Sequence, residues 1–168
     1  MNSELERAIR ESNLIEGVPN EGLYIQNHRT AGRAIEISAA EGELLHPRVL
    51  HAILFDGLNL PDLSPGGEYR TCQVRVGYYL PPPPDQVLNY MTFWWDLSLD
   101  DDPWSSHAHF EAIHPFIDGN GRVGRLVYWN RLMLDKKPID IIYAADRLVY
   151  YSRLERWREE KEFGQEQE

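Results

Sequence analysis

Four consecutive prolines, Pro81 to Pro84, constrain the fold of this chain more than any other feature. Proline lacks a backbone N–H and has a fixed φ, so such a run can continue neither a helix nor the interior of a sheet. It predicts a stiff, extended connection. Because 168 residues with 42% hydrophobic content suit one domain with a sizeable core, the run is expected to divide two helical halves of a single domain, 1–168.

Helical periodicity dominates on both sides of this connection. Helices are predicted over residues 3–16, 22–41, 46–58, 85–99, 103–113, 121–134 and 138–157. Residues 69–79 instead alternate Val74, Val76 and Tyr78 after the turn-forming Ser64-Pro65-Gly66-Gly67, which is typical of a strand. The predicted fold class is therefore all-α with a small β-hairpin at residues 64–80.

Charge and composition exclude several function classes. The net charge of −10 repels phosphate backbones, so no nucleic-acid partner is expected along a broad surface. The single Cys72 excludes an internal disulfide and favours a reducing, cytoplasmic compartment. No apolar stretch approaches the roughly 20 residues of a membrane span, and the first residues are polar and acidic, so neither secretion nor a membrane partner is expected.

The run His114-Pro-Phe-Ile-Asp-Gly-Asn-Gly-Arg-Val-Gly-Arg125 concentrates chemically useful groups. His114 can act as a general base near neutral pH, and Asp118 offers oxygens suited to Mg²⁺. The glycine-rich turn at residues 119–121 can direct backbone N–H groups at phosphate oxygens. Arg122 and Arg125 lie three apart on one helix face. The run therefore predicts a site for a nucleoside triphosphate.

The same run resembles the signature of the Fic-domain family, His-Pro-Phe-x-Asp-Gly-Asn-Gly-Arg-x-x-Arg, at every specified position. His107, Phe110, Ile113 and Asn130 also match residues common on the helices that flank this motif. One departure is Asp135-Lys-Lys-Pro138, where many relatives carry a glycine before the proline. The resemblance implies a single Fic-type helical domain, with the motif at 114–125 and the hairpin as a flap over the active site.

For the chemistry, the resemblance implies an autoinhibited, Mg²⁺-dependent transfer of AMP from ATP to a Ser, Thr or Tyr hydroxyl of a target protein. His114 would deprotonate the hydroxyl and Asp118 would hold the metal ion. The phosphates would be bound by Gly119, Asn120, Gly121, Arg122 and, at the γ-phosphate, Arg125. Gly119 and Gly121 favour AMP transfer over the phosphorylation carried out by a Doc-like branch of the family.

An N-terminal segment resembles the family's inhibitory helix, because Ser12 to Gly17 fits the pattern Ser/Thr-x-x-x-Glu-Gly/Asn. In this interpretation residues 1–17 form the inhibitory helix and Gly17 ends it. Glu16 would pair with Arg125 and compete with the γ-phosphate. Ser12, one turn earlier, could add a hydrogen bond. A second role stays open, in which Glu16 positions water for the removal of AMP from a modified protein.

The predicted flap indicates how a target would bind. A target segment would add to it as a strand, which fixes the backbone of the target through main-chain hydrogen bonds and contacts few of its side chains. The candidate target-binding residues are Tyr69, Arg70, Val74 and Val76, although the hairpin could merely cap the helical core. Arg70 or Arg75 could also touch phosphates. Tyr143, Tyr150 and Tyr151 are candidates for stacking on adenine, and the resemblance allows a homodimer.

Two other function classes fit parts of the sequence. One is a catalytically inactive adaptor that binds nucleotide or a partner, against which the intact His114 and Asp118 argue. The other is a zinc hydrolase using His107, His109, His114 and Asp118, which no known zinc spacing supports. His107 is instead predicted to be a core or supporting residue, and His109 to face solvent.

Overall fold

The computed structural model describes residues 1–58 and 66–161. The described part is helical, and its elements are α1 (Ser3–Ile15), α2 (Gly22–Ala40), α3 (Pro47–Phe55), η1 (Pro84–Gln86), α4 (Val87–Leu97), α5 (Pro103–Ile113), α6 (Asn120–Leu134), η2 (Ala144–Asp146) and α7 (Arg147–Glu160). None of the helices in this part is long and apolar enough to cross a membrane.

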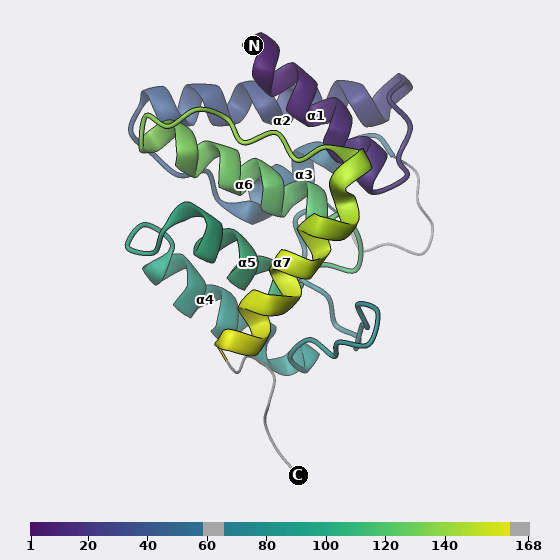
Figure 1. Cartoon of the computed structure of the whole chain (residues 1–168). Helices are drawn as coiled ribbons and strands as arrows, with labels where there is room; N and C mark the ends of the chain where they lie inside the picture. The colour runs from purple at the N-terminus through teal and green to yellow at the C-terminus, as the bar shows by residue number, and fades with distance from the viewer. Residues whose placement is uncertain (59–65, 162–168) are drawn as a thin grey trace.

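Helix α6 occupies the middle of the bundle (Figure 1). On one side it packs against α2, which also contacts α1 and α3, and on the other side against α5, which also contacts α4 and α7. Nearly every side chain of α6 is buried, and its apolar residues join the main core with those of α5 and the loop between the two helices. The motif at 114–125 therefore connects two core helices, which hold it rigidly.

Local capping explains where several helices begin. The Asn2 side chain accepts hydrogen bonds from the N–H groups of Glu4 and Leu5 at 2.6 and 3.3 Å. The Asp102 side chain accepts from Trp104 and Ser105, both at 3.1 Å. Each carboxyl or amide oxygen satisfies N–H groups that have no partner within the helix. Asp102 therefore caps α5, which covers the helix predicted over residues 103–113.

The predicted strand at residues 69–79 is wrong for the described part of the hairpin; residues 64 and 65 lie outside the described residues. Residues 66–83 form an irregular segment with one bridge, in which Val76 and Tyr79 exchange two backbone hydrogen bonds of 3.0 Å around Gly77. The N–H of Arg70 donates to the carbonyl of Pro115 at 2.9 Å rather than to a neighbouring strand. Tyr78 is fully exposed, so the alternation of Val74, Val76 and Tyr78 does not mark the buried face of a strand.

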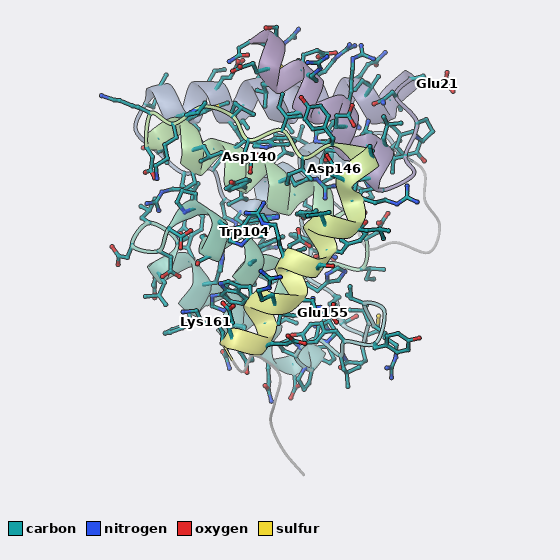
Figure 2. All side chains as sticks on the ribbon, in the orientation of Figure 1. Glu21, Trp104, Asp140, Asp146, Glu155 and Lys161 are labelled. Carbon is teal, nitrogen blue, oxygen red and sulfur yellow. The ribbon has the colours of Figure 1, made fainter. Side chains whose placement is uncertain are left out.

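The predicted last helix also begins later than expected. Residues 138–143 are extended and run back alongside α6, and only then do η2 and α7 follow (Figure 1). Hydrogen bonds hold this segment to α6, because Trp129 donates to the Asp140 carbonyl at 3.0 Å and Tyr128 to its carboxylate at 2.9 Å. Figure 2 labels Asp140, within this segment, and Asp146, which directly precedes α7. These contacts compete successfully with helix formation.

Four histidines are buried in the helical core: His28, His51, His107 and His109. Burial lowers the pKa of His28 well below its usual value, that of His51 and His109 to about 4, and that of His107 to about 3. The prediction that His109 faces solvent is wrong, because α7 covers it and Trp157 stacks on its ring at 5.6 Å. The burial of His107 is as predicted.

We expect acidification below pH 6.5 to destabilise the fold. Since the folded pKa values lie below the ordinary 6.5, the unfolded chain binds more protons between about pH 6.5 and 4, and the free energy of unfolding falls as pH falls through this window. The loss is about 1 kcal/mol per buried histidine at pH 5.5. Buried Glu111, whose pKa is raised to about 8, acts in the opposite direction but is a single group.

Melting temperatures followed by circular dichroism from pH 7.5 to 4.5 test this expectation. The melting temperature should begin to fall just below pH 6.5. A flat profile down to pH 5 would show that the histidines are not held neutral.

Candidate active site

The candidate base, His114, lies in a strained turn at the end of α5. Its φ of +50° places a residue other than glycine in the left-handed region, which costs energy that surrounding contacts must offset. Its N–H still donates to the Phe110 carbonyl at 3.0 Å. Burial lowers the pKa of the ring to about 4, so His114 is neutral at pH 7 and its lone pair is available to accept a proton.

Arg70 holds this turn in place. Its guanidinium donates to the His114 carbonyl at 2.8 Å and to the Pro82 carbonyl at 2.6 Å, with further bonds to the carbonyls of Cys72 and Ile113. The side chain is 1% exposed. The prediction that Arg70 binds a target or a phosphate is therefore wrong, because its donors are already occupied by backbone oxygens. Arg70 instead joins the segment before the prolines to the strained base.

The loop between α5 and α6 is closed by side chains that bond to its backbone. Asn120 donates to the Phe116 carbonyl and accepts from the Phe116 N–H, both at 2.9 Å. Phe116 itself is fully buried and anchors the loop in the core. His51 of α3 contacts the Asp118 carbonyl at 3.1 Å and stacks on Phe116 with ring centroids 4.0 Å apart. The Asn120 side chain is thus a loop closure, and only its backbone N–H is left for an anion.

The start of α6 forms an anion site. Gly119 is the N-cap residue with φ +79°, and a Cβ there would lie 2.6 Å from the Phe55 ring, so only glycine fits. The first N–H groups of α6, on residues 120–122, have no partner within the helix and carry the positive end of its dipole. Arg122 is buried, with its guanidinium carbon 5.2 Å from the Phe55 ring centroid. Phosphate oxygens would therefore meet N–H groups and a fixed positive charge.

Asp118 lies at the edge of this anion site with 56% of its side chain exposed. One carboxylate oxygen accepts from the N–H of Gly119 at 2.6 Å, and the other lies 3.6 Å from the Arg122 guanidinium. A hard oxygen donor beside a phosphate site fits Mg²⁺, which commonly binds one or two carboxylates together with substrate phosphates. The residues present thus suit a metal ion shared with a ligand.

Arg125 is completely buried, and α1 occupies most of its donors. Its Nε donates to the Ser12 hydroxyl at 2.8 Å, and its Nη2 donates to the Ser12 carbonyl at 3.2 Å and to Glu16 Oε1 at 2.6 Å. Its Nη1 lies 3.5 Å from the Tyr150 hydroxyl. The structure therefore brings Ser12 and Glu16 together with Arg125, which lies more than one hundred residues later in the sequence.

The end of α1 determines where Glu16 lies. Gly17 adopts φ +65°, its N–H donates to the Leu14 carbonyl at 3.2 Å, and Val18 donates to the Asn13 carbonyl at 2.9 Å. This is the Schellman arrangement, which needs a left-handed residue directly after the cap residue Glu16. The carboxylate then occupies the space beside Gly121 that a Cβ would fill. Gly17 and Gly121 therefore both permit the contact between Glu16 and Arg125.

A cavity of about 450 Å³ opens beside these groups. Its lining includes Glu16, segment 76–79, Glu111, His114, Arg125 and, from α7, Tyr151 and Arg158. Burial raises the pKa of Glu111 to about 8, so this carboxyl is protonated at pH 7. Glu155, a further lining residue, extends from α7 in Figure 2. The cavity therefore joins the candidate base, Gly121 at the start of α6 and a partly aromatic wall.

Other candidate residues fall in different places. Three tyrosines were candidates for stacking on adenine. Tyr150 is 3% exposed and Tyr143 does not line this cavity, so Tyr151 is the best placed of the three to contact the adenine ring. Tyr69 packs against Phe116 with ring centroids 5.5 Å apart. In the described residues no group of three or more His, Cys, Asp and Glu side chains could hold a metal ion. His107 instead bonds to the Tyr150 hydroxyl at 2.9 Å.

Comparison with known proteins agrees with this helical domain. The sequence model of the Fic/DOC family matches residues 43–132, more than half of the chain. This chain belongs to the Fic/DOC family. That match contains the loop from His114 to Arg125, whereas α1 precedes it.

Curated relatives cover more of the chain. Proteins named "Protein adenylyltransferase Fic" are 35% identical over 154 residues in Drosophila persimilis and 32% identical over 158 residues in Nematostella vectensis. The alignments include 86% and 88% of this chain but 28% and 35% of those proteins. The chain therefore spans about a third of the length of the curated relatives it matches.

Solved structures show the same fold. Fic-1 from C. elegans superposes with a TM-score of 0.74 at 22% identity, covering 92% of this chain and 56% of that one. A Fic domain containing signaling protein from Bacteroides thetaiotaomicron gives a TM-score of 0.73 at 22% identity, covering 90% and 70%. At this identity the likeness concerns the fold alone.

Replacement of Arg70 by lysine should weaken the His114 turn. Lysine keeps the charge but lacks the planar fork that reaches several carbonyls at once. We expect a loss of about 2 kcal/mol in the free energy of unfolding. Urea unfolding of Arg70→Lys measures it, and Arg75→Lys, at an exposed position of the same segment, is the matched control. Equal stability of the two variants would show that Arg70 does not hold the turn.

Proposed function

We propose that this chain is an autoinhibited protein adenylyltransferase, which moves AMP from ATP to a Ser, Thr or Tyr hydroxyl of a target protein. The observation that carries the proposal is the convergence of His114, the start of α6 and Arg125 on one cavity, with Glu16 on the arginine. The name of the curated relatives supports the same activity.

In the proposed reaction the target hydroxyl attacks the α-phosphorus of ATP, and pyrophosphate leaves. His114 takes the proton of the hydroxyl. Burial keeps its ring neutral, and the negative phosphates would raise its pKa from about 4 toward neutrality once ATP is bound. The N–H groups of residues 120–122 would stabilise the phosphate charge, and Arg125 would hold the terminal phosphate.

Asp118 would hold Mg²⁺ beside these phosphates, and the ion would neutralise their charge and orient them. The chain's own contribution is to place one exposed carboxylate next to the start of α6. The hydrogen bond from the Gly119 N–H to Asp118 fixes one carboxylate oxygen and leaves the other nearest to Arg122.

The same geometry supports inhibition by α1. Glu16 uses the Nη2 donor of Arg125 that a terminal phosphate would need, and the charge-assisted bond of 2.6 Å is strong for its type. ATP must therefore displace a carboxylate that is tethered to the same chain. The segment before the prolines remains a proposed docking site for the target, since Val76, Gly77 and Tyr78 form part of the cavity rim. Tyr69 and Val74 stay proposed contacts there, and a homodimer stays a prediction.

Replacement of Glu16 by glycine should release the activity. We expect intact-mass spectra of Glu16→Gly, incubated with ATP, Mg²⁺ and a cell lysate, to show AMP added to the chain or to lysate proteins, at least about tenfold more than for the unmodified chain. Glu16→Gly combined with His114→Ala is the control and should show none. If Glu16→Gly binds ATP but transfers nothing, the chain is an adaptor rather than a transferase.

The second candidate function is removal of AMP with Glu16 as the base. The observation that favours it is that the Glu16 carboxylate is 30% exposed in the cavity that also contains His114, where it can contact water. A target protein that the Glu16→Gly variant has modified with AMP can be purified. It can then be incubated with the wild-type chain and, separately, with the Glu16→Gln variant. Loss of AMP with the first and not with the second would assign the hydrolytic role to Glu16.

A further inference from the structure

The buried hydroxyl of Tyr150 has no role in the reaction as proposed above, yet it contacts the most important arginine of the site. The ring of Tyr150 lies 5.7 Å from the guanidinium carbon of Arg125, and its hydroxyl lies 3.5 Å from Nη1. Burial and the neighbouring Glu111 raise the pKa of the hydroxyl well above its usual value. Tyr150 is therefore a neutral partner at any working pH.

The contacts of Arg125 divide by nitrogen atom. Nε and Nη2 face α1, where they bind Ser12 and Glu16, whereas Nη1 faces α7. Among the hydrogen-bond partners that the structure gives Arg125, Tyr150 alone does not belong to α1 or the residue that caps it. When a phosphate replaces Glu16 at Nη2, the plane of the guanidinium is fixed by the contacts at the other two nitrogens.

The hydroxyl of Tyr150 is itself oriented by a second buried residue. Nε2 of His107 lies 2.9 Å from it. The ring of His107 is neutral, because burial lowers its pKa to about 3, so Nε2 can accept the hydroxyl proton. The oxygen lone pairs are then free to accept from Nη1 of Arg125. Tyr128 and Trp104 pack around the His107 ring, with centroid separations of 5.4 and 5.5 Å, and hold it in place.

Helix α7 carries Tyr150 into this position. Arg153, one turn later, lies with its guanidinium carbon 3.7 Å from the ring centroid of Trp104, which joins α7 to α5. Figure 2 shows Trp104 beside α7. The distance of 3.5 Å between Tyr150 and Arg125 is long for a hydrogen bond. We attribute this to Ser12 and Glu16, which draw the guanidinium toward α1.

We propose that Tyr150, oriented by His107, is a positioning residue that holds Nη1 of Arg125 so that Nη2 faces the terminal phosphate of a bound nucleoside triphosphate. The inference rests on the proposed function, since it concerns the same phosphate site. The effect of His107 on α5 and Tyr150 on α7 is then selective. They support recognition of the γ-phosphate and not of the α-phosphate or the adenine.

The test measures nucleotide affinity in the Glu16→Gly background, where Arg125 is free of the carboxylate. Calorimetric titrations with ATP and with AMP, both in Mg²⁺, should show that adding Tyr150→Phe weakens ATP binding about tenfold, because one bond to a charged donor is lost, while AMP binding changes less than about twofold. Phenylalanine keeps the ring, so only the hydroxyl is removed. Tyr128→Phe is the matched control, because its hydroxyl bonds Asp140 instead.

The role of His107 is tested by a double-mutant cycle. His107→Phe alone should reproduce the loss of ATP affinity, and His107→Phe combined with Tyr150→Phe should add little to it, since both act through one hydroxyl. Additive losses, or a parallel loss of AMP binding, would show general damage to the fold and overturn the inference. Melting temperatures of all variants identify such damage directly.

The outcomes separate the two proposals. If Glu16→Gly with Tyr150 intact binds no ATP, the proposed function fails and this inference fails with it. If it binds ATP with the same affinity whether or not the Tyr150 hydroxyl is present, the proposed function stands and the inference alone is overturned.

Discussion

One buried positive charge organises this domain. The Arg125 guanidinium is inaccessible to water, and a buried charge is tolerated only when polar partners surround it. Those partners come from the end of α1 and from α7, while Glu111 of α5 adds a further electrostatic influence. Elements from both ends of the chain therefore converge on a residue of the central helix. Under the proposed function a phosphate would meet the same demand for partners, because a phosphate oxygen can accept from Arg125 as well as a carboxylate can.

A second buried arginine, Arg70, differs from Arg125 in its partners and in its role. Arg70 binds only backbone carbonyls, and its role is to fix a backbone that would otherwise relax away from the left-handed conformation of His114. The two guanidiniums differ in what they are bonded to. Carbonyls at Arg70 are permanent parts of the fold, whereas the Glu16 carboxylate at Arg125 is exchangeable. In the proposed function the domain would thus combine a fixed base with an anion receptor that can change partners.

The parts of this arrangement that could be predicted are those whose residues lie close together in the sequence. The helices followed from local periodicity, and the site followed from a contiguous run of twelve residues and a short segment of α1. The roles of Arg70 and His51 did not, because their acceptors are backbone carbonyls 44 and 67 residues away, which leave no mark on the sequence. The same holds for residues 138–143, where bonds from Trp129 and Tyr128 outweigh helical propensity. For residues 69–79, the alternation of side chains predicted a strand, but the backbone N–H of Arg70 donates to the Pro115 carbonyl and not to a neighbouring strand.

The attachment of α1 has a consequence for the speed of regulation. Leu5, Ile9, Ser12 and Asn13 are completely buried, so α1 cannot leave the bundle without disrupting the core, whereas the Glu16 side chain lies at the helix end and is 30% exposed. Exchange at Arg125 therefore needs rotation of one side chain and not displacement of a helix. Such rotations take roughly picoseconds to nanoseconds. Under the proposed inhibition, the carboxylate would leave and return many times during one catalytic cycle. The strength of that inhibition would then depend on how often the arginine is vacant when ATP arrives, as in ordinary competition between two ligands.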